Sequence, residues 1–286
     1  MSKILITGAK GQLGRSLLDA ISHFPTHQVI GFDINELDIL DMKAVYDKAK
    51  AFGAEVLINC AAYTNVDKAE EDSDIAYAVN DKAVGGLTMV CNRLGMVLIH
   101  LSTDYVFDGK ATKPYKEEDI ARPLSVYGAS KLGGEQHVLS YRRGLVVRTS
   151  WLYSSSGNNF LSAILRLSGE QEVIKVVNDQ TGTPTCARHL AEVLLQIARE
   201  IEISYAPESL MGLYHFANSG SCTWFAFAQK IKEVAQLHTR MVPIPSSEYP
   251  TPAKRPPYSV LDTQRITKIF GIVPPHWEDG LKTYFI

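Results

Sequence analysis

Tyr127 and Lys131 are the residues of this sequence whose types and spacing most directly suggest chemistry. They stand four positions apart in a segment with helical character, so both side chains should project from one face of a helix. A tyrosine with a pKa of about 10 is a poor acid or base at pH 7, and a nearby cation such as Lys131 favours its phenolate. Thr103, at the end of an apolar run, can hydrogen-bond the same reacting oxygen. Together they could orient a carbonyl and protonate a developing alkoxide while a cofactor delivers hydride. Because Tyr-x-x-x-Lys pairs are common on helix surfaces, this interpretation depends on its context.

A glycine-rich turn near the N-terminus supplies that context. The apolar run 4–6 is followed by Gly8, Gly11 and Gly14 and then by a segment with helical spacing. Strand, glycine turn and helix in this order bring backbone N–H groups and a helix N-terminus together, which suits a pyrophosphate. The spacing is G-x-x-G-x-x-G, and a P-loop is excluded because Leu13 occupies the place of its second glycine. A glycine turn without a ligand is the alternative.

Asp33 adds an independently placed feature of a dinucleotide site. It ends the apolar run 28–33, about 20 residues after the glycine turn, where dinucleotide folds carry an acid for the ribose hydroxyls. A solvated loop carboxylate is the alternative. Further apolar runs lie at 55–62, 97–102 and 144–150, and they alternate with helical segments at 42–52, 73–94 and 125–143. This alternation predicts a doubly wound α/β fold with a parallel sheet that binds ligands at the carboxyl ends of its strands.

We expect two domains in the 286 residues. A dinucleotide-binding domain should span 1–152, the segment 171–203 should return to it, and 153–286 should mainly form a substrate-binding domain. The later segments predict strands at 173–177 and 213–217, helices at 185–202, 224–236 and from 263, and an irregular proline-rich stretch at 242–259. Expected helix N-caps are Asp41 and Thr223, and expected helix ends are Gly53 and Gly95.

The composition argues against nucleic acid and membranes as binding partners. Net charge is −2 and hydrophobic residues make up 45%, so no broad basic surface favours nucleic acid or an anionic membrane. No apolar run approaches the roughly 20 residues of a membrane span, and the N-terminus has no signal-peptide pattern. Four widely spaced cysteines are typical of reduced thiols in a cytoplasmic protein. The eight histidines show no ligand spacing, so we expect surface or packed residues and no metal site.

Eight motifs resemble, in this order, the extended short-chain dehydrogenase/reductases and, more narrowly, the dTDP-4-dehydrorhamnose reductase family. They are TGAKGQLG, AAYTNVDKAE, LSTDYVFDG, VYGASKLGGE, RTSWLY, GNNF, NDQTGTPT and YPTPAKRP, and they cover nearly the whole chain. The resemblance implies a Rossmann-like sheet with a smaller α/β substrate-binding domain. It implies reduction of the C4 keto group of dTDP-6-deoxy-L-lyxo-4-hexulose with NADPH or NADH, as in dTDP-L-rhamnose synthesis for cell-surface polysaccharides.

Roles for individual residues follow from the motifs and from this resemblance. The catalytic set is Thr103, Tyr127 and Lys131, with Tyr127 as proton donor and Lys131 lowering its pKa and holding the ribose. Expected cofactor contacts are Gly8, Lys10, Gly11, Gln12, Leu13, Gly14, Asp33, Asp38, Ile39, Ala61, Ala62, Tyr63, Tyr127 and Lys131. Expected substrate contacts are Thr64, Val66, Thr103, Asp104, Trp151, Asn159 and Arg255. Asp33 favours NADH, whereas Lys10 offers a cation to a 2′-phosphate. The resemblance implies a family that accepts both cofactors and often prefers NADPH, so we expect both to work, with NADPH modestly ahead.

Two positions differ from those expected for a metal-bridged dimer and for a related dehydratase. Some members dimerise around a magnesium ion held by glutamates, but Ser16 stands at one of those positions, so we predict no metal and either a monomer or a homodimer. A nucleotide-sugar 4,6-dehydratase would carry Asp-Glu after the threonine, whereas Asp104 is followed by Tyr105, a poor base. An epimerase-type relative and a non-catalytic NAD(P)-binding regulatory subunit are two further functions compatible with this fold.

Overall fold

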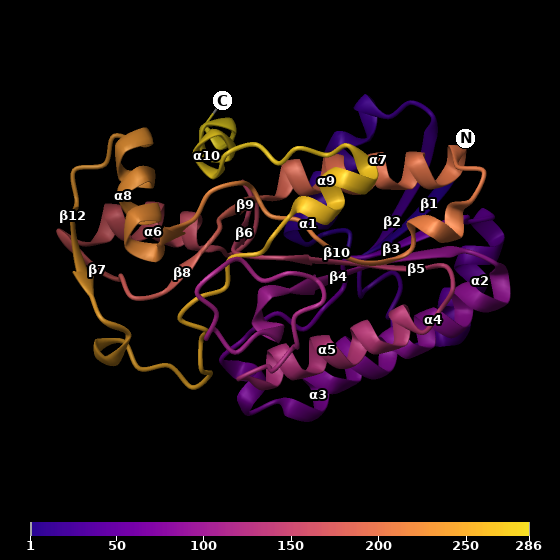
Figure 1. Ribbon diagram of the computed structural model, residues 1–286, viewed down its shortest axis with the longest axis horizontal. Coiled ribbons are helices and arrows are strands. Elements are labelled where there is room, and N and C mark those ends of the chain that lie inside the picture. Colours follow the sequence, from indigo (N-terminus) through magenta and orange to yellow (C-terminus); the bar gives the residue numbers. More distant parts are fainter. Residues whose placement is uncertain (1, 286) are drawn as a thin grey trace.

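A six-stranded parallel sheet forms the centre of the larger part of the molecule (Figure 1). The computed structural model describes residues 2–285. In spatial order the strands are β10 (Gly212–His215), β5 (Gly144–Thr149), β4 (Val97–Thr103), β3 (Val56–Asn59), β1 (Ser2–Thr7) and β2 (His27–Phe32). Every neighbouring pair is parallel. The predicted doubly wound sheet is therefore confirmed.

Helices cover both faces of this sheet (Figure 1). One layer holds α1 (Gln12–Ala20), α7 (Ala187–Ile203) and α9 (Gln264–Phe270). The other holds α2 (Met42–Phe52), α3 (Ser73–Tyr77), α4 (Ala83–Leu94) and α5 (Val126–Leu139). Alternate residues of β1 point into the hydrophobic cores on the two faces of the sheet. Ile4 and Ile6 pack toward α1 and α7, and Leu5 packs toward α2 and α4. The apolar runs of the sequence reflect this burial on both faces.

A smaller part, on the left of Figure 1, has a hydrophobic core of its own. Its helices are α6 (Phe160–Glu170), α8 (Trp224–Val234) and α10 (Trp277–Tyr284), and its main strands are β7 (Val173–Val177) and β12 (Arg240–Ile244), which pair in parallel. Two short pairs join it to the sheet region: β6 (Leu152–Tyr153) with β9 (Thr185–Cys186), and β8 (Thr181–Gly182) with β11 (Cys222–Thr223). Single 3₁₀ turns lie at Ile21–His23, Lys68–Glu70, Asp104–Val106, Pro207–Leu210 and Ser246–Glu248.

Three predicted elements differ from the structure. The stretch 242–259, expected to be irregular, begins within β12, where Pro243 is tolerated because a two-stranded sheet leaves each strand one free edge. The helix expected over 73–94 contains a π-helical turn, Ala78–Lys82, between α3 and α4. The helix expected from residue 185 begins at Ala187, since Thr185 and Cys186 pair with β6.

The expected helix ends follow local chemistry. The carboxylate of Asp41 accepts a hydrogen bond from the N–H of Ala44, and the hydroxyl of Thr223 accepts one from Ala226. Gly53 and Gly95 end α2 and α4 with positive φ angles of 70° and 68°. All four predictions are confirmed.

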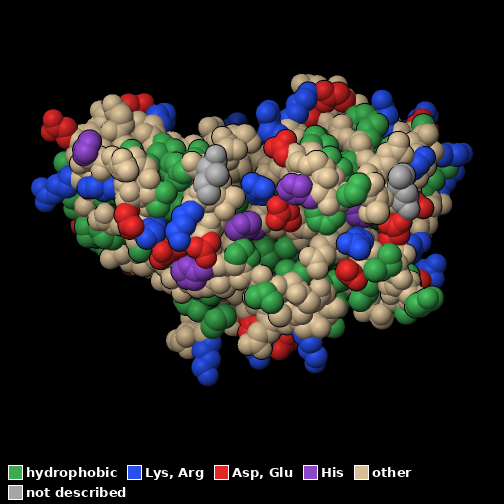
Figure 2. Space-filling view, turned by 90° about the horizontal axis from the view of Figure 1, so that it is seen from above, with side chains coloured by type: hydrophobic (Ala, Val, Ile, Leu, Met, Phe, Trp, Pro, Cys, Tyr) green, Lys and Arg blue, Asp and Glu red, His purple; other side chains and the backbone are tan. Residues whose placement is uncertain are grey.

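The surface is mixed in charge. On the face shown in Figure 2, Lys and Arg side chains are interspersed with Asp and Glu rather than collected in one basic field. Within residues 2–285, none of the helices combines the length and apolar character needed to cross a bilayer.

Candidate active site

A cavity of about 900 Å³ opens at the carboxyl ends of the sheet strands. Its lining comes from the segments that follow β1 to β5, as expected for a parallel sheet. The expected site residues that it brings together are Gly8, Lys10, Gly11, Gln12, Leu13, Gly14, Asp33, Asp38, Ile39, Ala61, Ala62, Tyr63, Thr64, Val66, Thr103, Asp104, Tyr127, Lys131 and Trp151. Arg255 lines a neighbouring cavity instead, and Asn159 lines neither of the two.

The glycine turn packs closely against neighbouring backbone and leaves a helix N-terminus open. Gly8 has a φ of +67°, and a Cβ there would lie 2.7 Å from the backbone nitrogen of Ala61. A Cβ on Gly14 would collide with the carbonyl oxygen of Gly8. Helix α1 starts with Gly11 as its N-cap and has no side-chain cap, so its first N–H groups are left for another acceptor. These features fit the diphosphate of a dinucleotide.

Asp33 and Lys10 meet at the edge of this turn. The Oδ2 atom of Asp33 accepts a hydrogen bond of 2.8 Å from the N–H of Lys10, which fixes the carboxylate against the glycine turn. The ammonium of Lys10 pairs with Glu36, a residue that the sequence reasoning did not single out. This hydrogen bond from Lys10 holds the pKa of Glu36 below its usual value. A 2′-phosphate would therefore compete with Glu36 for Lys10.

Thr103, Asp104 and Tyr127 form the reactive end of the cavity. The hydroxyl of Thr103 accepts a hydrogen bond from the N–H of Tyr105 and donates one of 3.1 Å to Oδ1 of Asp104. Ser125 caps α5 by accepting a hydrogen bond from the N–H of Gly128, so Tyr127 lies in the first turn of the helix. Strand β4 and helix α5 thus bring Thr103 and Tyr127 together.

The pKa of Tyr127 differs from the prediction. Burial raises it to about 12, a side-chain hydrogen bond with Thr103 opposes this rise, and the nearby Asp104 carboxylate adds to it. The net shift is therefore upward, whereas the sequence predicted a pKa lowered by Lys131. The reason is that Lys131 is buried and Tyr127 is half-buried, and removal from solvent disfavours the charged phenolate.

Asp104 is a buried carboxyl beside this pair. Burial raises its pKa to about 6, and hydrogen bonds with Ser259 and Thr103 limit the rise. The residue is 2% exposed. At pH 7 the group lies close to its titration range, so it can hold or release a proton.

Lys131 lies against polar groups that the sequence reasoning did not assign. Its Nζ atom is 3.3 Å from Nε2 of His100, and the Glu135 carboxylate is close enough to raise its pKa. Burial has the larger effect and lowers the pKa of Lys131 to about 8. His100 sits inside the apolar run of β4, and its only sequence signal is that a polar residue interrupts a buried strand.

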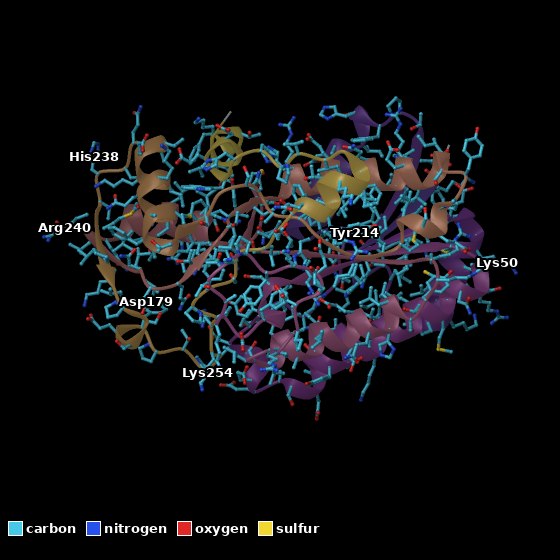
Figure 3. The ribbon with its side chains drawn as sticks, in the orientation of Figure 1. Lys50, Asp179, Tyr214, His238, Arg240 and Lys254 are labelled. Atoms are coloured by element: carbon cyan, nitrogen blue, oxygen red, sulfur yellow. The ribbon has the colours of Figure 1, made fainter. Side chains whose placement is uncertain are left out.

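A second cavity, of about 1180 Å³, adjoins the first. It lies among α6, β7 and the segment 246–257, and Tyr105 and Trp224 line both cavities. Figure 3 labels two of its residues, Asp179 and Lys254, in the half of the molecule that carries β7, away from Tyr214 and Lys50. An elongated ligand could therefore extend from the sheet ends into the smaller part.

Arg255 has a partner in the second cavity. Its two terminal nitrogens donate to the carboxylate of Asp67 over 3.1 and 2.7 Å, and the hydrogen bond from Arg255 lowers the pKa of Asp67. The fork expected to bind a diphosphate is thus already held by a carboxylate. Asp67 was not predicted, because nothing local in the sequence connects it to the segment 246–257.

Trp151 and Asn159 have different surroundings. Trp151 has a positive φ of 45°, and its ring stacks on that of Trp224 with centroids 3.4 Å apart. Asn159 caps α6 by accepting from the N–H of Ser162, and its amide donates to Oε1 of Gln12. The structure therefore gives Asn159 a capping role, with its amide already committed.

Metal ligation finds no support in the described part of the chain. Within residues 2–285, no three or more His, Cys, Asp or Glu side chains are grouped so that they could hold a metal ion.

Comparisons with known proteins agree with this geometry. The family model described as RmlD substrate binding domain matches residues 2–286. The chain is 42% identical to a dTDP-4-dehydrorhamnose reductase from Aggregatibacter actinomycetemcomitans, over 99% of this chain and 98% of that protein. A solved dTDP-4-dehydrorhamnose reductase from Clostridium acetobutylicum has a TM-score of 0.92 and 38% identity, over 99% of this chain and 98% of that one. Another, from Bacillus anthracis in complex with NADP, has a TM-score of 0.92 and 37% identity, over 100% and 99%. The chain belongs to the dTDP-4-dehydrorhamnose reductase family.

Proposed function

We propose that this protein reduces the C4 keto group of dTDP-4-dehydro-6-deoxy-L-mannose to give dTDP-L-rhamnose, with NADPH as the preferred donor and NADH also accepted. The observation that carries the proposal is that Thr103, Tyr127 and Lys131 share one cavity with a glycine turn fitted to a dinucleotide. The Bacillus anthracis relative in complex with NADP supports the choice of cofactor.

Tyr127 acts as the proton donor. A phenol with a pKa of about 12 is fully protonated at pH 7, and an alkoxide is a stronger base than a phenolate. The reduced nicotinamide, when bound, supplies the hydride for C4. As hydride arrives, the carbonyl oxygen gains negative charge and takes the phenolic proton, while the Thr103 hydroxyl orients that oxygen. Lys131 binds the nicotinamide ribose and stabilises the phenolate that remains.

The second cavity binds the nucleotide end of the substrate. Its volume and its position next to Tyr105 suit a dTDP group that extends from a sugar held beneath Trp151. Arg255 and Lys254 line it, and a diphosphate would compete with Asp67 for the Arg255 guanidinium. Thr64, Val66 and Asp104 lie in the first cavity, where the sugar would contact them.

The two cores support a division into domains. We assign residues 1–152, α7, β10 and α9 to the dinucleotide-binding domain, because they share the sheet and its core. The remainder, centred on α6, α8, α10, β7 and β12, forms the substrate-binding domain.

The test is a steady-state assay of NADPH oxidation with the dTDP keto-sugar, together with mass spectrometry of the product. Tyr127→Phe should lower kcat about 10²- to 10⁴-fold, the usual contribution of general acid catalysis, without changing cofactor affinity. Tyr141→Phe is the matched control, since its buried hydroxyl donates to the carbonyl of Met96 outside the cavity, and it should keep wild-type kcat.

Each outcome points to a different function. Retention of near-full kcat by Tyr127→Phe, with chemistry shown to limit the rate, would remove Tyr127 from its role. No turnover by the wild-type chain would favour a regulatory subunit. Loss of water from dTDP-glucose would favour a dehydratase, which the structure disfavours because burial raises the pKa of Tyr105, the residue at the position of the base.

A further inference from the structure

A continuous polar chain runs beneath the cavity, through the interior of the sheet, to Lys131. The hydroxyl of Thr7 on β1 donates to Oδ1 of Asn59 on β3 over 2.6 Å. The amide nitrogen of Asn59 lies 2.9 Å from Nδ1 of His100 on β4. Nε2 of His100 lies 3.3 Å from Nζ of Lys131 on α5. All four side chains are buried, so water does not compete for these contacts.

The next question is which nitrogen of the His100 ring carries a proton. Burial, and then the charge of Lys131, hold the pKa of His100 well below its usual value, so the ring is neutral. A neutral imidazole donates from one nitrogen and accepts at the other. If Lys131 is an ammonium it can only donate, so Nε2 must accept and Nδ1 must carry the proton.

Asn59 can satisfy that arrangement by a half-turn of its amide. Its Oδ1 atom then accepts from Nδ1–H of His100, and its Nδ2 atom donates to the hydroxyl of Thr7. With the amide as placed, Nδ2 faces His100, the ring proton moves to Nε2, and a neutral Lys131 amine can accept it. The four hydrogen-bonded side chains can therefore satisfy one another whether Lys131 is charged or neutral.

We propose that His100, oriented by Asn59 and Thr7, is the positioning residue of Lys131, and that its Nε2 atom accepts a hydrogen bond from the ammonium and keeps it charged. The inference rests on the proposed function only for the role of Lys131 in turnover. It adds a residue that acts through Lys131 and does not touch the reacting atoms.

The other groups around Lys131 do not replace His100. Glu135, one turn further along α5, raises the pKa of Lys131, but its carboxylate receives hydrogen bonds from Arg148 and Ser102. Cys60, after β3, has its pKa raised to about 12 by burial and is a neutral thiol at pH 7. Tyr127 lies one turn earlier on α5 and is protonated. Within residues 2–285, His100 Nε2 is thus the hydrogen-bonding partner that the structure places beside Nζ.

The first experiment is ¹⁵N NMR of the histidine rings in the ligand-free full chain at pH 6, with His100→Gln used to assign the signal. We expect a neutral ring whose proton is on Nδ1 and whose Nε2 is unprotonated. A ring proton on Nε2, or a doubly protonated ring, would overturn the proposal. Because this measurement needs no turnover, it decides the role of His100 even if the keto-sugar proves not to be the substrate.

The second experiment compares His100→Gln with His100→Asn by the pH dependence of kcat/KM. A glutamine amide oxygen can reach the place of Nε2, whereas an asparagine reaches only toward Asn59. Loss of a hydrogen bond to a charged group should move the alkaline limb of the Asn variant to lower pH by about one to two units, while the Gln variant keeps the wild-type profile.

A matched control separates positioning from packing. His27→Gln changes another buried histidine, which bonds Ser2 and the carbonyl of Leu195 away from the cavity, and it should keep the wild-type profile. Equal profiles for the two His100 variants, whether both shifted or both unshifted, would overturn the proposal. If the Asn variant does not fold, the ring tautomer of the wild-type chain decides the question alone.

Discussion

Replacing Glu135 by Gln should destabilise the fold strongly, because Glu135 forms a buried ion pair that ties α5 to β5. Its carboxylate accepts from Nε and Nη2 of Arg148 over 2.9 and 2.6 Å. The two side chains are 1% and 4% exposed. Glutamine keeps the shape but leaves the guanidinium without a counter-charge. Removing one partner of a buried pair costs about 3–5 kcal/mol, and losing two charged hydrogen bonds at about 1.5–3 kcal/mol each gives a similar figure.

The assay is the free energy of unfolding from denaturant titration. Glu170→Gln is the matched control, because Glu170 pairs with Arg166 over 2.9 Å on the exposed surface of α6. Exposed pairs of this kind contribute about 0–1 kcal/mol. If Glu135→Gln lowers the free energy of unfolding by no more than the control, the buried pair does not clamp the helix and the reasoning fails. Replacing both partners by apolar residues of similar volume should recover much of the loss.

Three further predictions concern ligands and pH. Lys10→Ala should lower kcat/KM for NADPH more than for NADH, and Asp33→Ala should do the opposite. The preference of the wild type for NADPH should shrink as the salt concentration rises. A tenfold preference of the wild type for NADH at low salt would contradict this prediction. Arg255→Ala should weaken binding of the nucleotide-sugar by about 1.5–3 kcal/mol in calorimetry, and Arg255→Lys should recover only part of that binding energy. Asp67→Asn should not weaken binding. Unchanged binding in the alanine variant would exclude a contact between Arg255 and the diphosphate. Burial raises the pKa of Asp104 from 3.8 to about 6, so the folded chain holds a proton that the unfolded chain has lost. This carboxyl therefore makes the fold less stable as pH rises from about 4 to 6, and Asp104→Asn should remove that part of the decline in unfolding experiments.

The sheet could be predicted because its signals are local. Strands buried on both faces appear as continuous apolar runs, and helix ends appear as single capping residues such as Asp41 and Gly53. The strand β12 was missed because Pro243 argues against a strand unless the free edge beside it is known. The π-helical turn was missed because its cause is tertiary: Asn80 bonds the backbone of Tyr63 and the hydroxyl of Ser130.

The cavity lining could be predicted because parallel strands end at one edge of a sheet, which places motifs from distant segments together. The partners of those residues could not. Lys10 meets Glu36 and Arg255 meets Asp67 only through loop conformations that no spacing rule describes. Glu36 and Asp67 therefore pair with the two cations, Lys10 and Arg255, that the sequence predicted to bind ligand phosphates.

The largest difference between sequence and structure concerns the direction of one pKa shift, and it bears on the chemistry. Spacing on a helix predicts that Lys131 lowers the pKa of Tyr127, which would suit a base that accepts a proton. Burial instead raises the pKa of Tyr127 to about 12 and lowers that of Lys131 to about 8. Both shifts favour the uncharged forms, and a phenol with a pKa of about 12 is protonated at pH 7 and can donate. Reduction of a ketone needs that donor, whereas oxidation of the alcohol would need the phenolate as a base. A further positive charge beside the ring, such as that of an oxidised nicotinamide, would favour the phenolate, so a protonated Tyr127 suits the reductive direction.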